Sequence, residues 1–377
     1  MSNQNKSTRL ILRVIGILGF MCFAGIAWFV LARSLKTCRS LDILLKRSNC
    51  QEVVFDSYHD VAFSDAQTIL VGWQSWQFSF TIRNLKDDTT RTLDLTEIDP
   101  TLPQESGLGV EDSSIVLSPD GRYIVASGYR DDYGSYILLV DTEPTHVSVK
   151  TLFFTTEDYY PPKRLSFSKD GKTLAGLVGD SVIFWDIPEG DELGGFEVSR
   201  CGNHNLVCQI EYSPDGAHVA INDPGEIGFE IWDIRDKTNP RLEYEYTDPE
   251  RFYIVSLSYS PDGNIAAIAS DGRGDENAIT FFDVEARKIV KRFTLLELRD
   301  DDHVSFSPDG SLYSIITCNQ IEIRRVADHS VITTVLLRWD TSPVLLPGCM
   351  EFAQITPDNQ SVYYGWAGGG LVKWKLP

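Results

Sequence analysis

Basic residues are scarce in most of this chain. Residues 48–377 contain 26 Lys or Arg against 53 Asp or Glu, which gives a formal charge of −27. A protein that binds nucleic acid needs a basic face to displace counterions from the phosphates, and this part of the chain would be repelled instead. The composition therefore excludes DNA and RNA as partners.

Local catalytic motifs are also missing. The sequence has no Gly-x-Ser-x-Gly elbow, no phosphate-binding glycine loop, no His-Glu-x-x-His and no Cys-x-x-Cys. The histidines lack short metal-binding spacing, and they are His59, His146, His204, His218, His303 and His329. We therefore assign no catalytic residue, no metal ligand and no cofactor. A site assembled at the centre of the molecule from distant segments stays open, because local motifs do not reveal one.

The sequence does contain a repeated turn. A short apolar stretch runs seven times into a Ser-Pro-Asp-Gly-like turn that begins at Ser64, Ser118, Ser168, Ser213, Ser260, Ser307 and Thr356. Successive turns lie 45 to 54 residues apart. A period in this range with several short strands per unit indicates a β-propeller. In such a turn proline presets φ, aspartate bonds to the nearby backbone, and glycine accepts a positive φ.

One repeat shows the strands that the pattern predicts. Around the turn at Ser213, apolar and polar residues alternate in four segments: Gln209–Tyr212, His218–Asn222, Phe229–Asp233 and Arg241–Tyr246. Four antiparallel strands in each period form one blade of a propeller. Seven periods therefore predict an all-β, seven-bladed β-propeller over residues 50–377.

The third strand of several repeats ends in an aromatic residue and an aspartate, as in Phe184-Trp185-Asp186, Ile231-Trp232-Asp233 and Phe281-Phe282-Asp283. In these endings the chain resembles the WD-repeat family, over residues 50–377. The Gly-His pair that usually precedes the first strand in that family is absent. The resemblance implies the same fold as the repeat pattern, a propeller of the looser Ser-Pro-Asp-Gly type.

The last repeat contains only three predicted strands, Met350–Ile355, Ser361–Trp366 and Leu371–Leu376. A blade without its outer strand would leave an open sheet edge, which favours aggregation. The segment Glu52–Phe55 precedes the first strand of the first repeat. We expect it to supply the missing strand, so that the two ends of the propeller interlock in one blade.

A different kind of segment precedes the propeller. Residues 14–32 are 19 residues without a charge, which at 1.5 Å per residue can cross the roughly 30 Å hydrocarbon core of a bilayer. We interpret them as a transmembrane signal anchor between a basic tail, residues 1–13, and a basic linker, residues 33–49. The linker suits anionic lipid headgroups. A cleaved signal peptide is the alternative, and it would leave a secreted propeller.

Two patterns disagree about the side of the membrane on which the propeller lies. The charges that flank residues 14–32 weakly favour a cytoplasmic propeller. The six cysteines outside this segment favour an oxidising compartment, because they form plausible pairs: Cys201 with Cys208, Cys318 with Cys349, and Cys38 with Cys50. Free buried thiols are the alternative. We expect a single-pass protein with an extracytoplasmic propeller.

The acidic residues gather in particular connections. In a propeller, the second-to-third and fourth-to-first connections share one end of the ring, here called the loop face. The acidic candidates in these connections are Asp131, Asp132, Glu157, Asp158, Asp271, Asp275, Asp300, Asp301 and Asp302. They could dock a basic protein segment. The alternative is turn chemistry alone, since hairpin loops favour aspartate.

The sequence thus leaves two functional hypotheses. The first is a membrane-tethered scaffold that binds an unidentified, basic protein partner through the acidic loop face. The second is a propeller enzyme, or a ligand-binding or metal-binding protein, with its site at the central channel. Polar side chains that converge on the channel would favour the second hypothesis.

Overall fold

The computed structural model describes residues 50–53, 60–64, 69–74, 78–85, 87, 89–102, 114–130, 134–143, 145–156, 165–198, 209–222, 228–250, 253–271, 277–295, 303–317, 320–336, 350–366 and 371–377. These residues are almost entirely in β-strands, with one short helix. Each strand belongs to an antiparallel sheet of four, and the described residues form seven such sheets.

The strands follow the seven repeats in order. Blade 1 contains β2 (Asp60–Phe63), β3 (Ile69–Gln74), β4 (Ser79–Asn84) and β5 (Thr90–Asp94), and helix α3 (Leu95–Ile98) follows. Blade 2 contains β6 (Ser114–Leu117), β7 (Tyr123–Arg130), β8 (Gly134–Asp141) and β9 (Ser148–Thr155). Blade 3 contains β10 (Leu165–Phe167), β11 (Thr173–Val178), β12 (Ser181–Asp186) and β13 (Glu192–Glu197). Blade 4 contains β14 (Gln209–Tyr212), β15 (His218–Asn222), β16 (Gly228–Asp233) and β17 (Arg241–Thr247).

The second half continues the same pattern. Blade 5 contains β18 (Tyr253–Tyr259), β19 (Ile265–Asp271), β20 (Asn277–Asp283) and β21 (Lys288–Leu295). Blade 6 contains β22 (His303–Phe306), β23 (Leu312–Thr317), β24 (Gln320–Arg325) and β25 (Val331–Leu336). Blade 7 contains β26 (Met350–Ile355), β27 (Ser361–Trp366), β28 (Leu371–Lys375) and β1 (Cys50–Val53).

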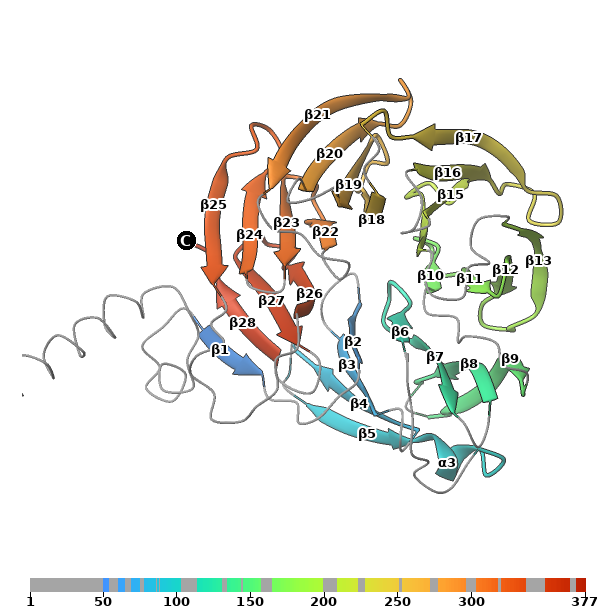
Figure 1. Ribbon diagram of the computed structural model, residues 1–377. Coiled ribbons are helices and arrows are strands. Elements are labelled where there is room, and N and C mark those ends of the chain that lie inside the picture. The colour runs from blue at the N-terminus through green and yellow to red at the C-terminus, as the bar shows by residue number, and fades with distance from the viewer. Residues whose placement is uncertain are drawn as a thin grey trace, which may run out of the picture.

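The blades are arranged in a ring (Figure 1), with first strands such as β2, β6, β18 and β22 nearest its centre. Neighbouring first strands contact each other, as β2 does with β6 and β18 with β22. The predicted seven-bladed propeller is therefore confirmed. The four strands expected around the turn at Ser213 are also confirmed, to within one residue at each end.

The ring is closed by a strand from the other end of the propeller. β1 pairs antiparallel with β28, with Cys50 opposite Trp374 and Val53 opposite Leu371, and Figure 1 shows the two strands side by side. The interlock is thus confirmed, but the closing strand begins two residues earlier than predicted. Cys50 consequently lies inside the strand rather than before it.

The hydrophobic core lies mostly between adjacent blades. One cluster joins Phe184 and Val198 of blade 3 to Tyr212 of blade 4, and another joins Phe229 of blade 4 to Phe282 of blade 5. The sheets therefore pack face to face around the ring, and each blade depends on its neighbours for burial.

The predicted basic tail, signal anchor and linker, residues 1–49, lie outside the described part of the chain. Within that part, no helix has both the length and the apolar character that crossing a bilayer requires.

Candidate functional sites at the loop face, the channel and blade 4

The predicted acidic candidates fall mainly outside the described residues. Asp271 is the last residue of β19, opposite Asn277 of β20. The other candidates are outside, namely Asp131, Asp132, Glu157, Asp158, Asp275, Asp300, Asp301 and Asp302. The proposed disulfides also fall mainly outside the described residues. Five of their six cysteines lie there, namely Cys38, Cys201, Cys208, Cys318 and Cys349. The acidic docking face and the disulfides stay predictions.

One acidic pair at the loop face, Asp248 and Glu250, is described, and both members share one arginine of the next blade. Asp248, whose side chain is 3% exposed, forms an ion pair with Arg292 of the next blade, and Arg292 also reaches Glu250 at 3.0 Å. The hydroxyl of Tyr246 donates to Asp248 at 3.0 Å. Burial raises the pKa of Tyr246, so it remains a donor. These contacts join blade 4 to blade 5, and one guanidinium shared by two carboxylates leaves a net charge of about −1 at this point of the loop face.

The opposite end of the ring, here called the turn face, carries the repeated turns. In six of them, the hydroxyl of the first residue donates to the aspartate two residues later at 2.5–2.7 Å. The same oxygen accepts the N–H of the residue five positions later at 2.9–3.0 Å. Hydrogen bonds from the hydroxyl and the backbone hold the pKa values of Asp170 and Asp358 below their ordinary value. These aspartates are structural.

The turns also pack against one another around the ring. A Cβ added to Gly171 would lie 3.3 Å from Cδ of Pro119, so the proline of one blade lies against the glycine of the next. In blade 3 this proline is replaced by Lys169, whose ammonium donates to the carbonyl of Pro261, two blades away, at 3.2 Å. Lys169 therefore ties non-adjacent turns together at this end of the channel.

The first strand of every blade contributes one partly exposed residue to the inner edge of the ring. This residue stands two positions before the turn, and the seven are Ala62, Val116, Ser166, Glu211, Ser258, Ser305 and Gln354. Their neighbours along the strands are mostly buried, for example Ile210 at 6% and Tyr212 at 6%. This inner-edge position is thus polar in blades 3 to 7, and Glu211 is the one ionisable residue among the seven.

Glu211 joins two blades through the channel. Its Oε1 accepts the backbone N–H of Tyr259, in the first strand of blade 5, at 3.1 Å. One blade earlier, the hydroxyl of Ser166 accepts the N–H of Tyr212 at 3.2 Å, so a serine performs the equivalent function there. Burial raises the pKa of Glu211 to about 7, although hydrogen bonds from Tyr259 and Ser258 act in the opposite direction. Sequence patterns missed this group because one glutamate in one repeat forms no motif.

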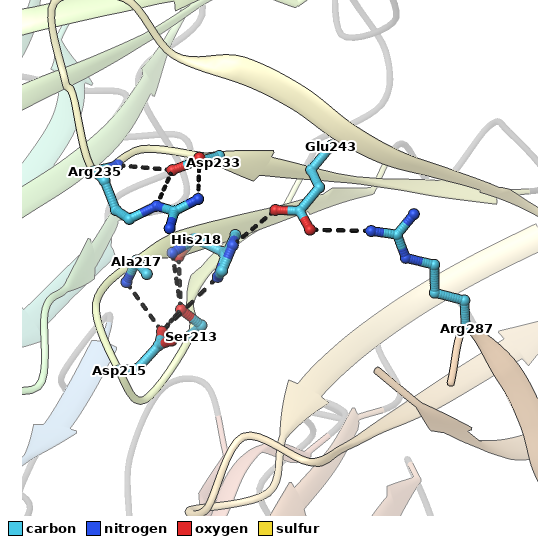
Figure 2. Close-up of polar contacts among 8 residues, drawn as sticks. All are labelled: Ser213, Asp215, Ala217, His218, Asp233, Arg235, Glu243 and Arg287. Carbon is cyan, nitrogen blue, oxygen red and sulfur yellow. Dashed lines mark hydrogen bonds and ion pairs between the residues drawn. The ribbon is translucent and has the colours of Figure 1, made fainter. Parts of the chain in front are cut away.

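Blade 4 also carries a chain of charged contacts on the turn face (Figure 2). Nε2 of His218 lies 2.9 Å from Glu243, and the second oxygen of Glu243 lies 3.0 Å from Arg287 of blade 5. The guanidinium of Arg287 lies over the ring of Tyr244 at 5.1 Å. On the same blade, Arg235 forms a two-pronged pair with Asp233. Glu243 therefore links the second strand of its own blade to the next blade.

A β-bulge gives Glu243 this position. The fourth strands of blades 2 to 6 each contain one extra residue opposite the third strand, at Leu152, Leu193, Glu243, Val290 and Ile332. Four of these five residues are apolar, and only blade 4 has a charge. A bulge re-aims the side chain at the extra residue, which is how Glu243 serves two partners. The sequence interpretation did not foresee the bulge, although its recurrence at one place in the repeat is a usable signal.

Metal binding was one of the open alternatives for the channel. Within the described ranges, no group of three or more His, Cys, Asp or Glu side chains could hold a metal ion. Among the seven inner-edge residues, the one titratable group is therefore the carboxyl group of Glu211. It can bind a proton or a hydrogen-bond donor.

Comparison with known proteins shows the fold and nothing narrower. No protein-family model matches the chain, and no curated protein matches it either. Among solved structures, 1527 chains match, which is too many for the fold alone to indicate a function. One is a chain in the crystal structure of the mitotic checkpoint complex, with a TM-score of 0.63 and 13% identity, covering 86% of this chain and 90% of that chain. The fold is that of a WD-repeat-like β-propeller.

Proposed function

We propose that this protein is a membrane-tethered interaction scaffold that binds a basic protein segment through the acidic loop face. The uneven distribution of acidic residues carries the proposal. The aspartates of the repeated turns are used in internal hydrogen bonds. The acidic candidates of the loop-face connections stand outside the repeated turns, and acidic side chains gathered at one end of the ring would attract a basic segment.

The architecture supports a binding role. The strands that flank the acidic connections belong to one rigid ring, and those connections range widely in length. Variable loops on a fixed framework are the usual way in which a common fold acquires a specific partner. The similar chain comes from a structure described as a complex, which supports protein partners in general.

Measurement of association kinetics tests the acidic face. The partner is first captured from membranes with the full chain and identified by mass spectrometry. The triple substitution D300N/D301N/D302N should then slow association and weaken its salt dependence, because exposed charges steer encounter. A matched control, E189Q/D191N/E192Q, removes three acidic charges from the turn face of blade 3. Equal association rates for both variants and the unmodified protein would refute the acidic docking face.

Membrane tethering by residues 14–32 and an extracytoplasmic propeller are part of the same proposal. The chain should remain with membranes after alkaline carbonate washing, because a spanning segment resists extraction. Protease added to intact cells should reach the propeller. Mapping of unreduced protein should link Cys201 to Cys208 and Cys318 to Cys349. Free thiols together with protection from protease would instead indicate a cytoplasmic propeller.

A second candidate function is favoured by Glu211. Its carboxyl group lies at the inner edge of the ring and accepts a hydrogen bond from Ser258, a setting that suits a small ligand with an amine or hydroxyl group. An amine ligand should raise the melting temperature of the unmodified protein and leave that of E211Q unchanged, with E285Q as the exposed control. Equal shifts in all three proteins would exclude Glu211 as the binding group.

A further inference from the structure

His329 stands at a turn position that blade 3 fills with a glycine. The third-to-fourth connections of blades 3, 5 and 6 each hold one residue at a positive φ, and these residues are Gly190 (+70°), Arg287 (+52°) and His329 (+58°). A left-handed backbone is unfavourable for a residue with a Cβ, whereas glycine adopts it readily. The contacts of the His329 side chain must therefore compensate for this strain.

These contacts lie in the seam between blades 5 and 6. The centre of the imidazole ring is 4.6 Å from that of Phe281 and 5.7 Å from that of Phe293, and both phenylalanines belong to blade 5. In blade 6, the hydroxyl of Tyr313 lies 3.3 Å from Nδ1 of His329. Phe281 and Tyr313 are members of the buried cluster that joins the two blades. His329 thus connects the hairpin of blade 6 to the core of this seam.

The contact with Tyr313 suits a neutral imidazole. Burial raises the pKa of Tyr313, so its hydroxyl keeps its proton and can donate to Nδ1 of His329. A protonated imidazole carries an N–H at both nitrogens and cannot accept a hydrogen bond at either. Protonation of His329 would therefore remove the acceptor that Tyr313 uses.

Cations from two strands also face the imidazole. Lys291 comes from β21 and Arg324 from β24, and the guanidinium of Arg324 lies over the ring of Phe293 at 4.9 Å. Burial, Lys291 and Arg324, in this order, lower the pKa of His329 below its ordinary value of 6.5. A proton on His329 would thus be placed in a partly desolvated position beside two positive charges.

Two carboxylates near this site offset the cations only in part. Asp328 raises the pKa of His329, but its effect is smaller than those of burial, Lys291 and Arg324. Its Oδ1 accepts the N–H of Ser330 at 3.0 Å and the hydroxyl of Ser330 at 2.6 Å. Glu322 forms an ion pair with Arg324 at 2.9 Å. The surroundings as a whole favour the neutral ring.

We propose that His329 is an acid-sensitive latch, which holds blades 5 and 6 together while its imidazole is neutral and loosens their seam when the ring is protonated. The latch depends neither on the membrane tether nor on the acidic loop face. Because folding lowers the pKa of His329, an opened seam binds a proton more readily than a closed one below about pH 6.5. Falling pH should therefore loosen this seam, and the seam that contains Gly190 should not respond.

Hydrogen exchange of the full chain between about pH 7.5 and about pH 5 tests the latch, after correction for the intrinsic effect of pH on exchange. Protection of residues 279–283 and 321–326, in the third strands of blades 5 and 6, should fall by at least about threefold as pH decreases. Residues 138–141 and 183–187, in the third strands of blades 2 and 3, should keep their protection. Exchange at Cε1 of the histidine rings, measured in the same samples, should show that His329 titrates below about pH 6.5.

Single substitutions separate the latch from other titrating groups. H329N tolerates a positive φ but cannot be protonated in this range, so it should abolish the fall in protection. H218Q and E211Q remove titratable groups of blade 4 and should preserve the fall. K291Q removes one exposed cation and should raise the pKa of His329, whereas K288Q should leave it unchanged. The lysine pair decides the question if H329N does not fold.

Three results would overturn the latch. The first is a fall in protection of the same size in H329N and in the unmodified protein. The second is constant protection of the seam between blades 5 and 6 across the whole pH range. The third is a pKa of His329 at or above about 6.5 in the folded protein, or one that K291Q and K288Q change equally.

Discussion

The two ends of the ring obey different rules. At the turn face, five residues separate the first and second strands of every blade. At the loop face, the connection from one blade to the next ranges from five residues between β17 and β18 to 19 residues between β5 and β6. The constant turns between first and second strands are therefore the part of the ring that specifies the fold, and the variable connections between blades are the part that is free to acquire a function.

Hydrogen bonding explains why the length of the repeated turn is constant. The hydroxyl of Ser307 both donates to Asp309 and accepts the N–H of Leu312, and this geometry fits only one loop length. The positive φ of Gly310, +72°, completes the turn. Backbone and side-chain groups are satisfied inside the turn, so its acidic residue has a structural function.

Loss of the closing strand should have the largest effect. Deletion of residues 50–53 removes the partner of β28, opens the ring and exposes a sheet edge. We expect the melting temperature to fall by at least ~10 °C and the protein to aggregate. Deletion of residues 43–46 in the linker is the control, and it should change the melting temperature little. Equal melting temperatures for the two deletions would mean that β1 does not hold the ring closed.

Glu211 should give the next largest effect, and one that depends on pH. Its pKa in the folded protein, about 7, lies above the ordinary value of 4.5, so folding favours the protonated form. The free energy of unfolding should therefore fall as pH rises from about 4.5 to 7, by up to about 3 kcal/mol. E211Q should abolish this fall and be the more stable protein at pH 8. Urea unfolding across this pH range, with E285Q as the control, measures it. Parallel curves for E211Q and the unmodified protein would contradict the assignment.

The hydroxyl groups of the repeated turns test the difference between the two ends directly. Ser307 is fully buried, and S307A would leave the N–H of Leu312 without its acceptor, at a cost of ~1–3 kcal/mol. S181A, at the loop-face end of blade 3, should change the free energy of unfolding by less than about 0.5 kcal/mol. Denaturant unfolding of both variants compares them. If S181A costs as much as S307A, the turn face has no special structural function.

The sequence predicted the constant end well and the remainder less well. The period of the turns and the apolar alternation determine the blade number and most strand positions, because the same physical rules recur seven times. The closing strand was placed two residues late, since its register depends on pairing with Trp374 and Leu371 at the far end of the chain.

The candidate sites were less predictable because they depend on single departures from the repeat. Glu211 replaces the serine found in neighbouring blades, and Glu243 replaces an apolar residue at the bulge. Their partners, Tyr259 and Arg287, come from the next blade. Such contacts require the ring geometry, which local patterns do not contain. Departures at one fixed place in a repeat are nonetheless visible in the sequence once the repeats are aligned.

The contacts of Glu243 should give the smallest effect. The side chains of Glu243 and Arg287 are 38% and 46% exposed, so solvent screens their interaction. A double-mutant cycle with E243Q and R287Q should give a coupling free energy between ~0.2 and 1 kcal/mol, decreasing as salt rises. The matched cycle uses Asp233 and Arg235, a pair within one blade. Both cycles should give similar small couplings if each pair is only a surface contact. A coupling above about 2 kcal/mol for Glu243 alone would show that it helps to fix the angle between blades 4 and 5, and the turn face would then carry a second structural device besides its repeated turns.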